Sequence, residues 1–456
     1  MKLLTSLISA ALFSMSMSRA CATDLMTSWQ AAQSHDPEFA AEQANYEASM
    51  THRDQARGMW LPTVSLTAGV DIQNTSTETT GAQFSAPGFN QTSGVAFDTS
   101  IHNGNAEQYA LVARQPLLNR TLLTQSRQAD LSSDIAELQW RAARQQLAIR
   151  VAERYFDVLV AVETLRLLKQ QQTAVDFAAN QINDSFKIGS IPVTDTFEAL
   201  ARSETIKAQI MAAEMDLQIR QSTFSDLTGM GSNDLVPLNL TSDPNRITLP
   251  PIDNCIRDAT LNNPALLIQE KKLNVAREEA EKHRGLYAPS LDLVAQVGAD
   301  RVHGSGDYGN AENNVNNRMI GIQLTIPLFS GGIRSAQYSE AVHLIDKSKA
   351  DGELLRQQIL VQIRAAWLGI TVGESRAAAL IQARKASIAR LDATRLGHSE
   401  GDRTTLDLLN AENDATSSEL AVLQAQIAVQ MNRLKLAQLT GNLDEGVLAG
   451  INSLLK

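Results

Sequence analysis

Four segments of the chain alternate apolar and polar side chains with a period of two, the pattern of a β-strand with one apolar face. Residues 64–72 show this alternation most clearly, and residues 291–297 repeat it in the second half of the chain. Residues 320–326 follow the same pattern, and residues 109–113 follow it less regularly because Val112 interrupts the polar side. We therefore predict four β-strands per chain.

Long stretches without proline, rich in Ala, Gln, Leu, Glu and Arg, follow the two pairs of strands. These residue types favour helices, and their apolar positions form the narrow stripe that is typical of coiled coils. The predicted helices cover residues 119–187, 194–227, 334–396 and 405–439. Turns at 189–192 and 397–403 separate them, so we predict two long antiparallel helical hairpins, the longest helix measuring roughly 100 Å at about 1.5 Å per residue.

Polar stretches lie between the two strands of each pair. Residues 74–107 and 301–317 are rich in Ser, Thr, Gly and Asn. This composition suits exposed segments that need no core of their own. We predict both stretches to be surface loops.

The chain contains two copies of one unit. Asp36-Pro37 in the first copy is matched by Asn263-Pro264 in the second, and Leu227-Thr228-Gly229 is matched by Leu439-Thr440-Gly441. The offset between the copies is smaller at the second match than at the first, which places a loop insertion between the strands of the first copy. The predicted divisions are a signal peptide over 1–22, a first helix-strand-strand-helix repeat over 23–230, a connector over 231–254, a second repeat over 255–441 and a C-terminal tail over 442–456.

The N-terminal segment 1–22 has the features of a secretory signal peptide. Lys2 precedes an apolar run over 3–13, and Ala20-Cys21-Ala22 supplies small residues for cleavage after Ala22. Lipidation of Cys21 is the alternative, although Arg19 stands where a small residue is needed. No later stretch of 18 or more apolar residues could form a transmembrane helix, so a membrane role would have to come from strands.

Charge and composition argue against several classes of protein. The chain has 40 Lys and Arg against 50 Asp and Glu and no basic stripe, so we expect no nucleic-acid partner. Its seven histidines do not fall at metal-ligand spacing, and no glycine-rich phosphate loop or G-x-S-x-G sequence is present. We therefore expect no enzymatic activity, no cofactor and no metal.

Two pairs of half-apolar strands cannot close a sheet by themselves. An open strand edge in hydrocarbon would leave backbone groups without hydrogen bonds, so several chains would have to close one barrel. Alternation between an apolar face and a face of Ser, Thr, Asp and Gln is typical of a membrane barrel with a wet lumen. Taken alone, the strands would also fit half of a soluble β-sandwich.

Several local sequences, together with the duplication, resemble the TolC family of outer-membrane channel proteins. Residues 24–38 resemble the start of its first helix, residues 326–332 its strand-to-helix sequence, and residues 401–409 its periplasmic tip. The spacing of Gly189 to Gly229 and its equivalent in the second copy also match. The resemblance covers nearly the whole mature chain.

This resemblance implies a mainly α-helical fold with long helical hairpins and four β-strands per chain. Three chains would form a homotrimer that closes a twelve-stranded β-barrel among outer-membrane lipids, continued by a helical tunnel across the periplasm of a Gram-negative bacterium. An inner-membrane transporter and its periplasmic adaptor would pass substrates to this channel.

The resemblance also implies a periplasmic gate at the hairpin tips. Its residues would be Thr194, Asp195, His398, Arg403, Asp407 and Asn410. Contact between Asp195 and Arg403 would hold neighbouring coils closed. His398 replaces a tyrosine and Asn410 replaces a second carboxylate that are frequent in the family, which changes the expected gate chemistry. The alternatives are that Asp195 and Asp407 are first-turn charges favoured by the helix dipole, that Arg403 is solvated and that His398 is a turn residue rather than a pH sensor.

The cargo is either protein, exported by type I secretion, or small drugs, exported by an efflux pump. We favour protein secretion because the chain keeps the undecorated two-copy plan and lacks a lipidated N-terminus. A periplasmic coiled-coil adaptor is the alternative from another class, but it would have one hairpin and no amphipathic membrane strands.

Overall fold

The computed structural model describes residues 23–232, 234–238, 249–285 and 288–455. The predicted signal peptide, with Cys21, lies outside the described residues. The chain forms two compact units. We call Glu47–Ala136 with Gln269–Gly352 the strand unit, and Met1–Tyr46, Glu137–Ile268 and Glu353–Lys456 the core unit.

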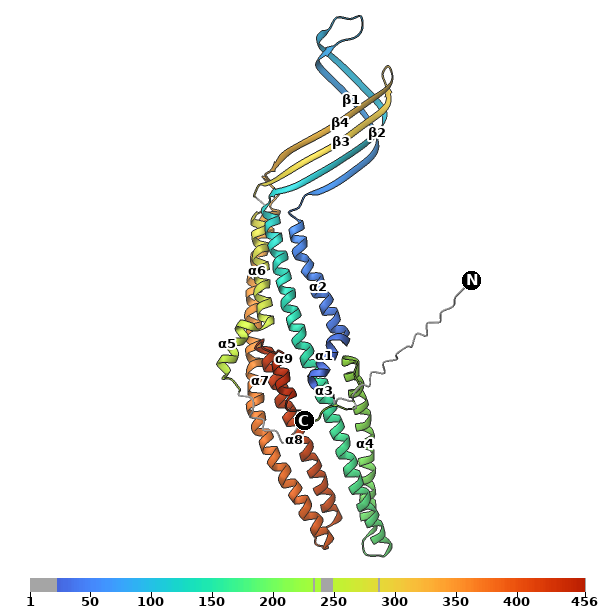
Figure 1. The fold of residues 1–456 in the computed structure, drawn as a ribbon, viewed down its shortest axis with the longest axis vertical. Coiled ribbons are helices and arrows are strands. Elements are labelled where there is room, and N and C mark those ends of the chain that lie inside the picture. Colours follow the sequence, from blue (N-terminus) through green and yellow to red (C-terminus); the bar gives the residue numbers. More distant parts are fainter. Residues whose placement is uncertain (1–22, 233, 239–248, 286–287, 456) are drawn as a thin grey trace, which may run out of the picture. The chain divides into compact units, whose positions relative to one another are not determined.

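The same order of helices and strands occurs in both halves of the described chain, and the second half adds α9 at its end (Figure 1). The first half contains α1 (Leu25–His35), α2 (Pro37–Gly58), β1 (Thr63–Phe84), β2 (Thr92–Leu118), α3 (Arg120–Lys187) and α4 (Val193–Thr228). The second half contains α5 (Ile252–Asn262), α6 (Pro264–Gly285), β3 (Ser290–Gly306), β4 (Gly309–Thr325), α7 (Ile333–Ser399), α8 (Thr405–Leu439) and α9 (Glu445–Asn452). The four predicted long helices correspond to α3, α4, α7 and α8, with small shifts at their ends.

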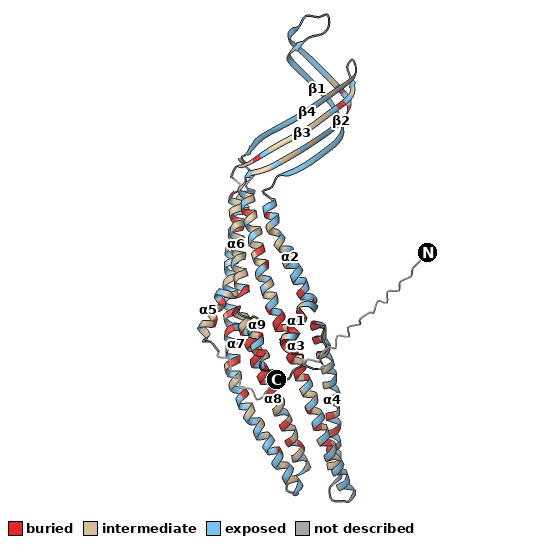
Figure 2. Ribbon diagram, viewed as in Figure 1, coloured by how far each residue is buried: buried red, intermediate tan, exposed pale blue. Residues whose placement is uncertain are grey.

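The four predicted strands are confirmed and form one antiparallel sheet in the order β1-β2-β3-β4. The register places the apolar positions of all four strands on one face. Leu66 lies opposite Leu111 and Leu111 lies opposite Val297. On the β4 side, Leu293 lies opposite Ile322. We call these side chains the apolar band. Its exposed members are Val64, Leu66, Val70, Ile72, Tyr109, Leu111, Leu293, Val297, Ile320, Ile322 and Leu324. Figure 2 shows the strands mostly in the colour of exposed residues.

The prediction that residues 74–107 and 301–317 are surface loops is wrong for most of their length. Residues 85–91 connect β1 to β2, and Asp307-Tyr308 connects β3 to β4. Pairs such as Ser76 with Ser100 continue the ladder far beyond the apolar band. Polar residues on both faces remove the period-two signal, whereas the backbone hydrogen bonds of a hairpin need no apolar face and Thr favours strands.

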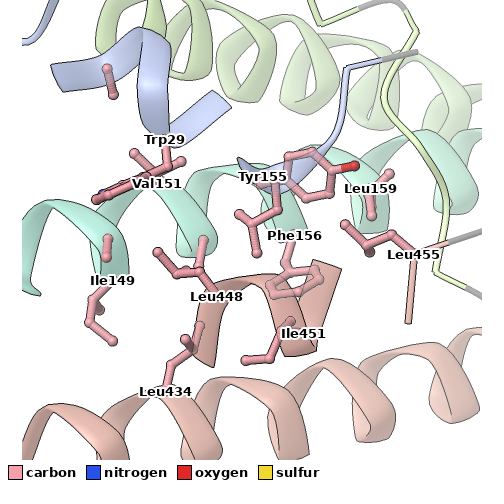
Figure 3. Packing of buried hydrophobic residues seen from close by; sticks show 14 of the residues in the cluster. Trp29, Ile149, Val151, Tyr155, Phe156, Leu159, Leu434, Leu448, Ile451 and Leu455 are labelled. Carbon is pink, nitrogen blue, oxygen red and sulfur yellow. The ribbon is translucent and has the colours of Figure 1, made fainter. Parts of the chain in front are cut away.

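The core unit is centred on the middle of α3 (Figure 3). Tyr155 and Phe156 pack there with Trp29 of α1, Phe224 of α4 and Leu434 of α8. The segment 442–456, predicted as a tail, contains α9, whose Leu448 and Ile451 are buried in the same cluster. None of the helices within the described residues carries an apolar stretch long enough to cross a membrane.

Candidate functional site

The two hairpin tips, α3 to α4 and α7 to α8, share one turn geometry. Gly189 and Gly401 both adopt left-handed conformations, with φ of 76° and 85°. In each turn the residue after the glycine donates a hydrogen bond to the carbonyl five residues earlier. The Ser190 N–H donates to the Ser185 carbonyl at 3.0 Å, and the Asp402 N–H donates to the Gly397 carbonyl at 2.8 Å. Glycine is favoured because a Cβ is strained at positive φ. The two tips therefore belong to one structural motif.

The helices that leave the two turns begin differently. In the second tip Thr404 caps α8: the Asp407 N–H donates to Thr404 Oγ1, and the Thr404 N–H donates to Asp407 Oδ2, both at 3.1 Å. This reciprocal pair is a capping box. In the first tip Pro192 takes the cap position and provides no side-chain hydrogen bond, although Asp195 occupies the same third position of its helix.

Among the predicted gate residues, Asp407 has a carboxyl that is held by hydrogen bonds from Thr404 and lies near the charge of Arg403. The pKa of its carboxyl is lowered, first by the Thr404 backbone N–H, then by the Thr404 hydroxyl, with a further contribution from the positive charge of Arg403. A carboxylate at a helix N-terminus is also favoured by the helix dipole. The geometry therefore gives Asp407 a capping role, while its part in a gate stays a prediction.

His398 connects the two helices of the second tip. Its Nε2 lies 3.1 Å from the Thr405 hydroxyl, so a side chain at the end of α7 meets one at the start of α8. The ring is half-buried. Whether His398 is a turn residue or a pH sensor stays a prediction.

Three of the other predicted gate residues are more exposed to solvent than His398. Thr194 is exposed and its hydroxyl donates to Asp195 Oδ1 at 3.2 Å. Arg403 and Asn410 are exposed. Within the described part of a single chain no ion pair joins Asp195 to Arg403, so a contact between neighbouring coils stays a prediction.

Two residues at the tips were missed by sequence reasoning. Thr404 makes the capping box, and its spacing from Asp407 was a usable signal. Glu198 occupies the position of the first copy that is equivalent to Asn410, so the carboxylate that is missing from the second tip is present in the first. The offset between the copies could have revealed it.

The predicted tip residues include charged side chains. Among the described residues no group of three or more His, Cys, Asp and Glu side chains could hold a metal ion. The carboxylates of Asp195, Glu198 and Asp407 would attract cations if several copies met around one axis. A charged constriction at the tips stays a prediction.

Comparisons with known proteins identify related sequences and folds. The family model described as outer membrane efflux protein matches residues 29–230 and 255–442. The chain is 24% identical to the outer membrane protein TolC of Escherichia coli (strain K12) over 445 residues, which cover 95% of this chain and 85% of TolC. It is 27% identical to the alkaline protease secretion protein AprF of Pseudomonas aeruginosa over 440 residues, which cover 94% of this chain and 86% of AprF. The solved structure of CusC has a TM-score of 0.71 at 15% sequence identity, with 92% of each chain covered.

Proposed function

Since the chain belongs to the outer membrane efflux protein family, we propose that it is the outer-membrane exit duct of a type I protein secretion system. The coarser assignment follows from the family: the chain is an outer-membrane protein that serves in secretion or efflux. The finer assignment concerns the cargo, the partners and the assembly.

The apolar band carries the proposal of a membrane-inserted barrel. Its side chains are far from buried, ranging from 37% exposed at Leu293 to 79% at Val70. Apolar surface of this extent is unfavourable in water, at roughly 25 cal/mol per Å². The stretch from Val64 to Ile72 has the length of the roughly 9 to 11 residues with which a tilted strand crosses a bilayer. The opposite face, with Ser65, Thr67 and Asp71, would line a wet lumen.

The free edges of the sheet support a trimer. β1 and β4 are edge strands of the four-stranded sheet, and an unpaired edge in lipid leaves backbone groups without partners. Three chains would supply twelve strands, enough for a closed barrel.

A comparison between the repeats supports the same assembly. Leu409 of α8 is 5% exposed because it packs against Val175 and Ile206 of the first hairpin. Its equivalent in the first copy, Phe197, is 65% exposed. A second chain that packs against Phe197 as the first hairpin packs against Leu409 would bury this ring.

The similarity to AprF over nearly the whole chain favours protein as the cargo. The duct itself would be passive and would carry out no catalysis, while an inner-membrane transporter and a periplasmic adaptor would supply the energy and the connection. The six residues of the predicted gate would close the periplasmic end.

The experiment is deletion of the gene, followed by analysis of culture-supernatant proteins and of drug susceptibility in the same strain. The proposal expects loss of a secreted protein with unchanged susceptibility, and recovery of secretion by the wild-type gene. Increased drug susceptibility with unchanged secretion would favour a multidrug efflux channel instead.

Two variants test the membrane assignment separately. Leu66→Asp places a charge on the apolar band, whereas Thr67→Asp places the same charge on the opposite face of the same strand. We expect the first variant to be lost from the outer membrane and the second to be retained. A soluble monomer without detergent would instead favour a periplasmic coiled-coil adaptor.

A further inference from the structure

A pocket of about 500 Å³ lies in the core unit, where α5, α7, α8 and α9 meet the end of the connector. Most of its lining is apolar, including Leu249, Ile370, Leu436 and Ile451. This volume and this lining are typical of sites for small molecules. The predicted gate residues are not part of it.

Two glycines of α9 line the pocket beside the side chains of Val447 and Ile451 from the same helix. Gly446 and Gly450 both line it, and residues four apart lie on one face of a helix. Glycine inside a helix costs about 1 kcal/mol relative to alanine, so helix stability does not account for the pair. A second wall is held in place by Trp367, whose indole N–H donates to the Pro250 carbonyl at 3.1 Å.

The charged groups around the pocket are predominantly negative. Asp258 of α5 and Asp444 before α9 line it. The Asp258 carboxylate lies 3.9 Å from the exposed guanidinium of Arg257, which does not line the pocket. Asp444 Oδ1 accepts the Val447 N–H at 3.0 Å, a capping bond that leaves its charge in place. Arg433 also lines the pocket, but its guanidinium is paired with Glu374 at 2.6 Å. The charge of Arg433 is therefore matched by another carboxylate.

We propose that this pocket binds a hydrophobic organic cation, with its apolar groups against the leucine and isoleucine walls and its charge facing Asp258 and Asp444. An apolar lining favours rings or branched alkyl groups, and the two carboxylates select positive over negative charge. This inference does not depend on whether the exported cargo is protein or drug.

Cys255 provides a reporter inside the pocket. Its side chain lines the pocket, is 1% exposed and precedes Asp258 by one turn of α5. Burial raises the pKa of its thiol, with a further contribution from Asp258, so that alkylation is slow enough to follow. The chain has two cysteines, so Cys21→Ser leaves Cys255 as the sole thiol.

The experiment measures the rate of Cys255 alkylation by N-ethylmaleimide, followed by mass spectrometry, in phosphatidylcholine nanodiscs. Tetraphenylphosphonium is the probe, and tetraphenylborate is its match in size and shape with the opposite charge. We expect the phosphonium to slow alkylation roughly fivefold or more once it exceeds its Kd several times, and the borate to leave the rate unchanged.

Matched variants test the role of the two carboxylates. Asp258→Asn with Asp444→Asn should abolish protection, since asparagine keeps the cap of α9 and removes only charge. Asp253→Asn, on an exposed position of α5, should keep protection. Equal protection by both probes, protection that survives in the double variant, or a thiol that no maleimide reaches would each overturn the proposal. Thermal melting checks that each variant is folded.

Discussion

Each copy of the repeat has one residue between its first two helices, which we call the joint. The joint between α1 and α2 in the first copy is charged, and the joint between α5 and α6 in the second copy is neutral. Asp36 caps α2 by accepting the Phe39 N–H at 3.1 Å, and it also pairs with Arg150 of α3. The equivalent Asn263 caps α6 by accepting the Ala265 N–H at 2.9 Å, and its amide donates to the Leu439 carbonyl at 2.8 Å. Both residues precede a proline that begins the helix. The comparison shows that the cap is the shared requirement, whereas the ion pair belongs to one copy.

A second difference lies at the equivalent aromatic residues of α3 and α7. Tyr155 is fully buried, and its hydroxyl donates to the Val236 carbonyl at 2.8 Å. Trp367 is only half-buried and donates to the Pro250 carbonyl. Both acceptors lie in the predicted connector. Each copy thus ties its long helix to the connector through one aromatic donor, with deeper burial in the first.

The largest expected effect comes from removing the cation of the charged joint. Arg150→Met leaves Asp36, which is 5% exposed, without its ion-pair partner, and we expect a loss of about 3–5 kcal/mol in the free energy of unfolding. The equivalent Gln362→Met, at an exposed position, should change stability by less than about 0.5 kcal/mol. Denaturant melts of the purified protein measure both.

The double variant Asp36→Asn with Arg150→Met copies the neutral joint of the second repeat. It should recover most of the lost stability, because asparagine can still cap α2. If Arg150→Met and Gln362→Met were equally mild, the ion pair would contribute nothing to the joint.

The next effect concerns Leu409 and Phe197, which occupy equivalent positions with different burial. Leu409→Ala should destabilise the chain by about 3 kcal/mol, because it leaves a cavity in a packed cluster. Phe197→Ala should leave the stability of a single chain unchanged but weaken the association of chains. Denaturant melts and native mass spectrometry separate the two results. Full retention of the oligomer by Phe197→Ala would contradict the proposed contact.

A smaller effect is expected from the two aromatic donors. Tyr155→Phe leaves the partly buried Val236 carbonyl without this donor, at a cost of about 1–2 kcal/mol. Trp367→Phe should cost less than about 1 kcal/mol, because its site is half-exposed. Stability melts at neutral pH give the order, and equal losses would contradict the difference in burial.

The pH dependence sharpens this comparison. Burial, followed by the charge of Asp24, raises the pKa of Tyr155 well above its usual value near 10. The unfolded chain therefore loses this proton at lower pH than the folded chain, so stability from Tyr155 is present below about pH 10 and falls as pH rises further. Tyr155→Phe should reduce this alkaline loss, and Trp367→Phe should not.

The smallest energetic effect is expected at the hairpin tips. Arg403 has Ile191 as its equivalent, so only the second tip offers a cation there. A partly exposed pair with Asp195 would contribute about 1 kcal/mol or less per copy. Arg403→Ala should raise single-channel conductance in planar bilayers, whereas Ile191→Ala should not. Identical conductance in both variants would show that Arg403 is a solvated turn residue with no part in a gate.

The long helices and the four strands were predictable from the sequence because their signals are local and repeated. Helix propensity over many residues and alternation in residues 64–72 need no knowledge of neighbours. The turns at Gly189 and Gly401 were equally readable, because glycine is favoured at positive φ. The ends of the β-hairpins beyond the apolar band were not predictable from the sequence, because residues that are polar on both faces carry no periodic signal.

The candidate site at the hairpin tips could be predicted only in part from the sequence. The constant offset between the copies in this part of the chain places Asp195 and Asp407 at equivalent helix starts. The spacing of Thr404 and Asp407 already indicates a capping box. The sequence could not tell that His398 meets Thr405, since this contact depends on the path of the turn.

The sequence by itself determined the repeat, the helix and strand types and the face of the sheet that is apolar. Only the tertiary structure decided which residues the helix caps pair with and which residues are buried. Asp36 and Asn263 look interchangeable as helix caps, and their different partners come from separate helices that the fold brings together. The pocket at Cys255 arises in the same way from α5, α7, α8 and α9. Contacts between distant segments are the part of the molecule that local patterns do not encode, because each depends on how whole helices pack.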